Sequence, residues 1–488
     1  MNTSSYSSSS DEEFLNSPTF ERSFEHAARV TTLAESFSLT HFNPFQEQVL
    51  DATLAGKDSI IVQPTGSGKS LCFQFPPVYE QKKAIVVVPT ISLMNDQVTN
   101  LAEKGIKAVL LGSAQLDKSV EDIALSPKSD YRLVFVTPEW IAKPEKLHKV
   151  KQLMLSKKLS LIAIDEAHLF HQWQEFRGAF KSLENLQLDF PSTPIMALTA
   201  TAPPEVMRSI RKLVREPLVV RSSVNRPNIY LECEEIPDNI GKDDLSYFAM
   251  RVAEKVENRC TIIYTDFINN VGKIVSALFE LGLDSVAYTG EMDVRSRGES
   301  YTRWRSGDVN IMVATSAFGM GVDKSDIQHI VRYGVPDNIC NWAQELGRAG
   351  RGGQRATATI FYSMSHIDHA GAWIREHFHN SEHVKRVLKE FSNSWQYVMS
   401  HLAAKCRRQM LLELFSEEAI SKEDGENCCD VCMHKGKEEG THVDCHSELA
   451  ILVDAIDTIG DKGEVKLAQW IRGTSLQWTN DYNKSANS

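Results

Sequence analysis

The chain has 488 residues, of which 42% are hydrophobic, and a formal net charge of −11 at pH 7. This length allows two or three domains with separate cores, and the negative balance gives no overall attraction to nucleic acid. Any contact with DNA or RNA would therefore need a local basic strip. No apolar run approaches the roughly 18 residues that span a bilayer, and the N-terminus lacks the apolar core of a signal peptide. We expect an intracellular protein without a membrane segment, and its nine cysteines argue for metal binding rather than a disulfide scaffold.

The first part of the chain divides into a polar tail and a region of alternating apolar and amphipathic segments. Residues 1–22 are rich in serine and contain an Asp-Glu-Glu cluster, so they cannot bury enough apolar surface to become ordered. Over residues 23–220, short apolar runs predict buried parallel strands with helices between them. The predicted strands are residues 59–62, 84–88, 132–136, 159–164 and 194–198.

A second set of apolar runs predicts another domain over residues 221–363. Its predicted strands are residues 260–264, 310–314, 329–332 and 356–361. The predicted fold class is α/β, with two tandem doubly wound parallel-sheet domains. Beyond them, residues 364–442 predict a small helical subdomain, and residues 443–488 contain two amphipathic helix candidates.

A glycine-rich segment directly after the first predicted strand has the pattern of a phosphate-binding loop. Residues 63–70 read Gln-Pro-Thr-Gly-Ser-Gly-Lys-Ser. Glycines let backbone N–H groups close around phosphates, Lys69 would reach the β and γ phosphates, and Ser70 would hold magnesium. Gln63 replaces the first glycine of the strict pattern, and the alternative is a glycine-rich turn beside a surface lysine. The predicted nucleotide-binding residues are Thr65, Gly66, Ser67, Gly68, Lys69 and Ser70.

Two adjacent carboxylates, Asp165 and Glu166, follow the apolar strand predicted at residues 159–164. They would lie at the carboxyl edge of the sheet, where ligands of such folds bind. We expect Asp165 to orient magnesium and Glu166 to polarise the attacking water. A surface acidic pair is the alternative, but Ala167 and His168 complete an Asp-Glu-Ala-His box downstream of the phosphate loop.

A pair of arginines, Arg348 and Arg351, lies in a glycine-rich segment that we expect to open a helix. Both guanidiniums would then lie on one face and reach the γ phosphate across the cleft between the domains as arginine fingers. Structural salt bridges are the alternative. Together with residues 88–97, 197–202 and 314–321, these segments occur in the order that an ATP-driven nucleic-acid motor requires.

Segments around these motifs make the chain resemble the RecQ-type DNA helicases of superfamily two. Residues 37–46 are similar to the RecQ adenine-reading motif, with Gln46 at its glutamine position, and residues 172–177 resemble the aromatic-rich loop that couples DNA contact to hydrolysis. The resemblance covers about residues 37–472. It implies two RecA-like domains that use ATP and Mg²⁺, with Ser70 and Asp165 at the magnesium and Gln344 at the nucleotide.

A cysteine pattern near the end of the resemblance predicts a zinc site. Twenty-one residues separate Cys406 from Cys428, and two separate Cys429 from Cys432. Four thiolates at this spacing suit a closed tetrahedral site that holds together a small helical subdomain. The adjacent pair is similar to the Werner-type branch of the family. Buried free thiols are the alternative, with His434 and Cys445 as substitute ligands.

The predicted DNA contacts come from the aromatic loop and from the edges of both sheets. Trp173 and Phe176 would stack on bases or wedge between them, and Arg177 would contact phosphate. Aromatic residues three apart are more often core in an unknown protein, but their place just after the hydrolysis box favours function. The predicted backbone contacts are Thr90, Ser92, Thr137 and Thr315.

The chain departs from the family pattern at several positions. Leu39 replaces an aromatic residue that stacks on adenine, Asn43 replaces an arginine, Thr289 stands where Tyr-His is common, and Gly352 replaces an aspartate. The aromatic loop is one residue shorter than typical and lacks a histidine. We expect weaker nucleotide affinity or looser base choice, and hydrolysis that survives with altered coupling to DNA.

Three functions compete at this point. The first is an ATP-dependent 3′–5′ DNA helicase that moves on single strands and unwinds duplexes in repair or recombination. An RNA helicase is the second, although the cysteine cluster and the aromatic loop argue against it. The third is a DNA-stimulated ATPase that binds or anneals DNA with poor unwinding, because residues 443–488 resemble only the opening helices of a winged-helix domain and leave no room for its duplex-splitting hairpin.

The expected partners are single-stranded and forked DNA, together with recombination or repair proteins. No run of basic residues makes a clear nuclear signal. Nuclear placement follows from the Werner-type cysteine pattern alone, and the sequence does not predict an oligomeric state.

Overall fold

The computed structural model describes residues 18–112, 115, 117, 119–173, 182–237, 244–256, 259–316, 318, 324–366, 381–417 and 428–434. The chain falls into two compact units, Met1–Met433 and His434–Ser488. Of the second unit only His434 is among the described residues, so the predicted winged-helix segment at residues 443–488 lies outside them. Residues 1–17 of the predicted tail (residues 1–22) also lie outside them, whereas residues 18–22 are not a disordered tail in the structure but the first part of a helix, Pro18–Phe37. In the described parts, no helix is both long and apolar enough to cross a bilayer.

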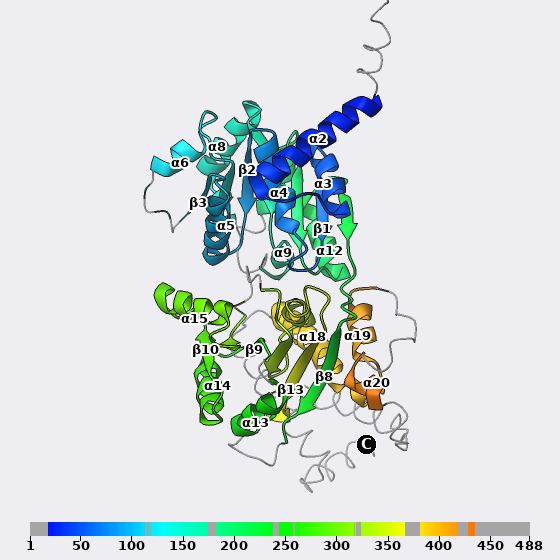
Figure 1. Cartoon of the computed structure of the whole chain (residues 1–488). Coiled ribbons are helices and arrows are strands. Elements are labelled where there is room, and N and C mark those ends of the chain that lie inside the picture. Colours follow the sequence, from blue (N-terminus) through cyan, green and yellow to red (C-terminus); the bar gives the residue numbers. More distant parts are fainter. Residues whose placement is uncertain are drawn as a thin grey trace, which may run out of the picture. The chain divides into compact units, whose positions relative to one another are not determined.

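The first α/β domain is built on a seven-stranded sheet in the order β3-β4-β2-β5-β6-β1-β7, and each neighbouring pair of strands is parallel. The sheet and its helices appear in Figure 1. The strands are β1 (Ser59–Val62), β2 (Lys83–Val87), β3 (Ala108–Leu111), β4 (Leu133–Val136), β5 (Leu159–Ile164), β6 (Ile195–Thr199) and β7 (Leu218–Arg221). The helices are α2 (Pro18–Phe37), α3 (Pro44–Leu54), α4 (Lys69–Tyr79), α5 (Ile91–Glu103), α6 (Ser119–Ala124), α7 (Pro138–Ile141), α8 (Pro144–Leu155), α9 (His168–Trp173), α11 (Leu186–Asp189) and α12 (Pro204–Ile210), with 3₁₀ turns at Leu183–Asn185 and Arg211–Leu213.

Alternation of side chains along the strands gives the first sheet two cores. In β2, Ile85 and Val87 belong to one buried cluster, whereas Ala84 and Val86 belong to the other. Successive residues of a strand point to opposite faces. Helices therefore cover both faces, and the central strands are buried at every position.

The second α/β domain has a six-stranded parallel sheet in the order β10-β11-β9-β12-β13-β8. Its strands are β8 (Ile229–Glu235), β9 (Thr261–Thr265), β10 (Ser285–Tyr288), β11 (Ile311–Ala314), β12 (His329–Tyr333) and β13 (Ala356–Tyr362). Its helices are α13 (Asp244–Val256), α14 (Ile268–Glu280), α15 (Val294–Ser306) and α16 (Ile339–Leu346). The prediction of two parallel-sheet α/β domains is confirmed.

A helical region follows the second sheet and packs on one of its faces. It contains α18 (Ser381–Val398), a 3₁₀ turn at Met399–His401, α19 (Arg407–Leu414) and α20 (Asp430–His434). Its residues Tyr397, Leu411 and Cys429 share a buried cluster with the sheet. Figure 1 shows α19 and α20 beside β8, and a bridge between Leu231 and Cys429 joins that edge strand to the cysteine region.

Candidate active site

The predicted phosphate loop connects β1 to α4, and its shape depends on two glycines. Gly66 and Gly68 have φ angles of 79° and 86°, in the left-handed region that only glycine adopts without cost. A Cβ on Gly68 would lie 2.6 Å from Nε2 of Gln46. Because Gly68 immediately precedes α4, the free N–H groups of that helix face the loop, as an anion-binding site requires.

Gln46, the predicted adenine-motif residue, is buried in α3 and holds the phosphate loop. Its Nε2 donates to the Gly68 carbonyl at 3.0 Å, and its Oε1 accepts from the Asn43 backbone N–H at 2.8 Å. The Asn43 side chain donates to the Ser67 carbonyl at 3.3 Å. Leu39 is 43% exposed. Within the segment that resembles the adenine-reading motif, Asn43 and Gln46 therefore hold the phosphate loop in place through hydrogen bonds to its backbone carbonyls.

Lys69, the first residue of α4, lies folded over the same loop. Its Nζ donates to the carbonyls of Gln63 at 2.7 Å and Pro64 at 3.0 Å. Burial lowers the pKa of Lys69, while the charges of Glu166 and Asp165 act against that shift. Thr65 is half-buried in the loop, and the Ser70 hydroxyl accepts from Nε2 of Gln97 in α5 at 3.5 Å. The lysine, the serine and the carboxylates thus share one end of the sheet.

Asp165 and Glu166 directly follow β5, as predicted, and sit at its carboxyl edge. Oδ1 of Asp165 accepts from the backbone N–H of Glu166 at 3.0 Å. Glu166 has a φ of 50°, so its backbone adopts the left-handed region that is costly for a residue with a side chain. Such strain persists only where the surroundings hold it. The backbone of Glu166 is therefore fixed in one orientation beside Asp165.

The two carboxyl groups are pushed toward different protonation states. Burial, followed by the charge of Glu166, raises the pKa of Asp165 to about 7. Burial also opposes ionisation of Glu166, but a hydrogen bond from His168 and the charges of Lys69 and Arg348 outweigh it, and its pKa is lowered. The pair therefore presents an ionised Glu166 at neutral pH, which a base for water activation needs.

His168 links the acidic pair to the second α/β domain, a role that sequence reasoning did not assign to it. Its Nδ1 lies 3.0 Å from Oγ1 of Thr199 and 3.3 Å from Oε2 of Glu166. Its Nε2 lies 3.2 Å from Nε2 of Gln344, which also approaches Oγ1 of Thr201 at 3.4 Å. Because the Gln344 amide N–H can only donate, the geometry favours a neutral His168 that carries its proton on Nδ1. All of these residues occur in motifs that the sequence displays, but their mutual contacts are not readable from it.

Arg348 and Arg351 lie in the loop after α16, which ends at Leu346, so the prediction that their segment opens a helix is wrong. A Cβ on Gly66 would lie 3.1 Å from Cδ of Arg351, which places that side chain against the phosphate loop. Arg348 is buried, and its charge acts on Glu166. The structure therefore brings both predicted arginines to the acidic pair and the loop.

A buried ion-pair network anchors α16, the helix that carries Gln344. Arg332 of β12 donates to Oε1 of Glu345 at 2.6 Å and also to Asp266. Burial raises the pKa of Glu345 to about 7, although Arg332 opposes that shift. These contacts tie α16 to β12 and to Asp266, whereas a buried ion pair is by itself weak evidence for added stability.

Two of the predicted DNA contacts, Thr90 and Thr137, line an open hollow of about 1040 Å³ at the carboxyl edge of the first sheet. Its wall also carries both basic and acidic residues, namely Lys143, Lys146, Lys149, Asp117, Glu121, Asp122 and Glu139, and ion pairs join Lys146 and Lys149 to Glu121. Thr315 is buried just beyond β11 of the other sheet. The side chains of Ser92 and Trp173, and all of Phe176 and Arg177, lie outside the described residues.

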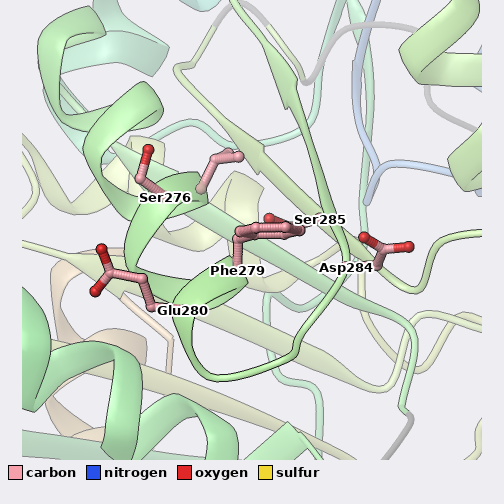
Figure 2. A pocket seen from close by; sticks show the side chains of 6 residues that line it. Ser276, Phe279, Glu280, Asp284 and Ser285 are labelled. Atoms are coloured by element: carbon pink, nitrogen blue, oxygen red, sulfur yellow. The ribbon is translucent and has the colours of Figure 1, made fainter.

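A second, smaller hollow of about 250 Å³ lies far along the chain from these motifs. It is lined by α14 and the edge strand β10, where Phe279 and Ser285 face it between Glu280 and Asp284 (Figure 2). None of the predicted site residues lines it. It is therefore not part of the candidate active site.

The four predicted cysteines form one cluster. The Sγ atoms of Cys406, Cys428, Cys429 and Cys432 all lie within 4.8 Å of one another. Sγ of Cys406 is 3.4 Å from that of Cys428 and 3.8 Å from that of Cys429. Tetrahedral zinc with Zn–S bonds of about 2.3 Å holds its sulfurs roughly 3.8 Å apart, so the cluster fits that ion. Within the described residues His434 is not part of the set, and Cys445 lies outside them.

The two α/β domains that carry these motifs match family models of known helicases. The DEAD/DEAH box helicase model matches residues 43–210, and the helicase conserved C-terminal domain model matches residues 243–353. The chain is 31% identical over 430 residues to the putative ATP-dependent DNA helicase Q1 of Caenorhabditis briggsae, and the match covers 86% of this chain and 68% of that protein. This chain belongs to the RecQ family of ATP-dependent DNA helicases.

A second relative is much longer than this RecQ chain. The chain is 31% identical over 471 residues to the mouse bifunctional 3′-5′ exonuclease/ATP-dependent helicase WRN, a match that covers 93% of this chain but 33% of the mouse protein. The chain thus spans a third of one relative and about two thirds of the other. The crystal structure of the DUF1998 helicase MrfA bound to DNA and AMPPNP shares the fold, with a TM-score of 0.58 at 19% identity over 81% of this chain and 58% of that one.

Proposed function

We propose that this RecQ chain is an ATP-dependent helicase that moves 3′ to 5′ along single-stranded DNA and separates duplexes during repair or recombination. The observation that carries the proposal is the meeting of both α/β domains at one site. Arg351 lies against Gly66 of the phosphate loop, and Gln344 contacts His168 beside the acidic pair. Direction and DNA preference rest on membership of the family.

The chemistry proposed for the site is hydrolysis of the γ phosphate. ATP would be held by the phosphate loop and Lys69, and Glu166 would orient and deprotonate the attacking water. Mg²⁺, held by Ser70 and Asp165, would neutralise the charge on the phosphate oxygens. Arg348 and Arg351 would stabilise the charge that develops in the transition state.

Coupling between hydrolysis and movement is proposed to run through His168. This ring touches Glu166 on one side and Gln344 of the second domain on the other. Loss of the γ phosphate would weaken the hold of the second domain on the site, because Arg348 and Arg351 would lose a partner. The domains could then separate and shift their grip on DNA.

The proposed DNA path uses the threonines at the carboxyl edges of both sheets, Thr90, Thr137 and Thr315. The hollow that Thr90 and Thr137 line supports this path by its place at the carboxyl edge of the sheet, not by its charge, because Lys146 and Lys149 are paired there with Glu121 and Asp122. The remaining proposed contacts are Ser92, Trp173, Phe176 and Arg177. Single-stranded and forked DNA are the proposed substrates.

A structural zinc ion is proposed at the cysteine cluster. Cys406, Cys428, Cys429 and Cys432 would hold it as thiolates, and their spacing in the structure supports this assignment. Zinc would tie α19 to α20 in a region too small to build a core of its own. Nuclear location and contact with repair or recombination proteins follow from the family alone.

The test is ATP turnover of the purified chain without nucleic acid, with single-stranded DNA and with single-stranded RNA. Stimulation by DNA that is lost in Glu166→Gln is expected, and a forked duplex with a 3′ tail should be unwound faster than one with a 5′ tail. Stronger stimulation by RNA would contradict the DNA assignment. DNA-stimulated turnover without strand separation would replace the proposal by a DNA-stimulated ATPase that binds or anneals DNA.

A further inference from the structure

The segment that joins the two α/β domains, residues 221–229, carries Arg226. The guanidinium of Arg226 binds residues 347–354, the loop that carries Arg348 and Arg351 and that is called the finger loop below. Nη1 of Arg226 donates to the carbonyl of Gly347 at 3.0 Å. Its Nη2 donates to the carbonyls of Ala349 at 2.8 Å and Gly350 at 2.9 Å. These carbonyls lie on both sides of Arg348 and just before Arg351, so one side chain holds the backbone from which both catalytic arginines extend.

Asn228, two residues further along, reinforces the same loop. Its Nδ2 donates to the carbonyls of Gly350 at 2.9 Å and Gln354 at 2.8 Å. A Cβ on Gly350 would lie 2.3 Å from that Nδ2, and Gly350 has a φ of 59°. The joining segment and the loop are therefore packed too closely to move independently of one another.

The other side of this segment is bound by the cysteine region. Nη1 of Arg408 donates to the Arg226 carbonyl at 2.7 Å and Nη2 to the Ile229 carbonyl at 2.5 Å. Its Nε points to Sγ of Cys428 at 3.3 Å, and Arg408 is buried. One guanidinium thus touches both the cysteine cluster and the backbone of the residue that binds the finger loop.

A second contact fixes the start of the segment. Glu417 accepts from the backbone N–H of Val224 at 3.0 Å and from the Ser223 hydroxyl. Arg221, at the end of β7, donates to the Phe415 carbonyl at 2.5 Å. Residues 221–229 therefore do not behave as a free linker, because they are bound along their length between the helical region and the finger loop.

We propose that Arg226 is a positioning residue for ATP hydrolysis, and that Arg408 makes the cysteine region set the position of Arg348 and Arg351 through it. This inference rests on the proposed function. Rigid placement is needed because a catalytic group displaced by about 1 Å can cost on the order of 100-fold in rate. The cysteine region then acts on turnover without touching ATP.

The experiment compares Arg226→Lys with Arg215→Lys in the full chain. Arg215 is the control in the first domain, because its guanidinium also bridges backbone carbonyls, at 2.6 Å to Pro191 and 2.9 Å to Thr193. It additionally pairs with the buried Asp58 at the start of β1, so its loss is the more severe disturbance of the fold, at the opposite end of that strand from the phosphate loop. Lysine keeps the charge at both sites but cannot span several acceptors with a planar fork. DNA-stimulated kcat should fall by roughly 10- to 100-fold in Arg226→Lys. KM for ATP, binding of single-stranded DNA and zinc content should not change, and Arg215→Lys should keep the wild-type kcat.

The second arm tests the link to the cysteine region with Arg408→Lys and the double variant. If Arg408 acts through Arg226, the two losses in kcat are less than additive on a logarithmic scale. A wild-type kcat in Arg226→Lys, an equal loss in Arg215→Lys, or additive losses in the double variant would each overturn the proposal. A wild-type chain without DNA-stimulated turnover would instead refute the proposed function itself.

Discussion

Replacing Gly68 by alanine should damage the phosphate loop in two separable ways. Gly68 has a φ of 86°, and its added Cβ would lie 2.6 Å from Nε2 of Gln46, which is buried and donates to the Gly68 carbonyl. The backbone strain would affect stability alone. The clash would push the Gln46 amide out of its place and release the loop from α3.

The magnitudes follow from these two contributions. Left-handed backbone costs a residue with a Cβ roughly 1–2 kcal/mol. Loss of the Gln46 hydrogen bond adds about 1 kcal/mol, so the free energy of unfolding of the first domain should fall by about 2–3 kcal/mol. Gly105 is the matched control: it has a φ of 71°, and nothing lies within 4 Å of an added Cβ. Gly105→Ala should therefore cost only the strain and leave ATP binding unchanged.

The assay measures urea unfolding and the affinity for a non-hydrolysable ATP analogue in Gly68→Ala, Gln46→Ala and the double variant. Gln46→Ala removes the atom that the new Cβ would meet. In that background, Gly68→Ala should cost only its strain, so the two changes should be clearly non-additive. Strict additivity, or an unchanged affinity for the analogue in Gly68→Ala, would refute the claim that Gln46 braces the loop.

Three further variants test other parts of the molecule. Glu166→Gln should lower kcat by roughly 10²- to 10⁴-fold and retain binding of the ATP analogue, and near-normal turnover would exclude Glu166 as the base. Burial lowers the pKa of His329 in the folded protein to about 3. In the unfolded chain this histidine becomes protonated below about pH 6.5, whereas in the folded protein it stays neutral until the pH approaches 3. Stability should therefore fall by about 2 kcal/mol between pH 6.5 and 5, and urea titrations of His329→Gln should show a smaller loss, whereas equal pH slopes would contradict this cause. Cys432→Ser should reduce zinc bound per chain and the unfolding midpoint of the helical region, and full zinc content would remove Cys432 from the site.

The sequence predicted the central strands of both sheets and missed all four edge strands. The nine predicted strands correspond to β1, β2, β4, β5, β6, β9, β11, β12 and β13, and the missed ones are β3, β7, β8 and β10. Central strands are buried on both faces and contain mostly apolar residues. Charged residues interrupt the apolar pattern of the edge strands β7 (Leu-Val-Val-Arg) and β8 (Ile-Tyr-Leu-Glu-Cys-Glu-Glu), so hydrophobic runs reveal them poorly. Composition does not explain why β3 was missed, because its four residues, Ala-Val-Leu-Leu, are all apolar.

The phosphate loop and the Asp-Glu-Ala-His box predicted which residues lie together at the candidate active site, because each motif follows a strand at the same edge of a parallel sheet. The placement of Lys69, Asp165 and Glu166 needed only that rule. The contacts of Arg226 could not be predicted in this way. The sequence analysis assigned no role to residues 225–228, and the partners of Arg226 lie more than a hundred positions away along the chain, where only folding brings them together.

Asn43 illustrates how a departure from the family pattern acquires a physical reason in the structure. The sequence predicted weaker nucleotide affinity or looser base choice, since Asn43 replaces an arginine of the adenine-reading motif. In the fold, the Asn43 backbone N–H donates to Gln46, and its side chain donates to the Ser67 carbonyl of the phosphate loop. Only the second of these bonds needs the asparagine side chain, because the backbone N–H would be present with arginine as well. The structural role that asparagine has at this position is therefore its contact with the phosphate loop, a contact that the comparison with the family pattern did not suggest.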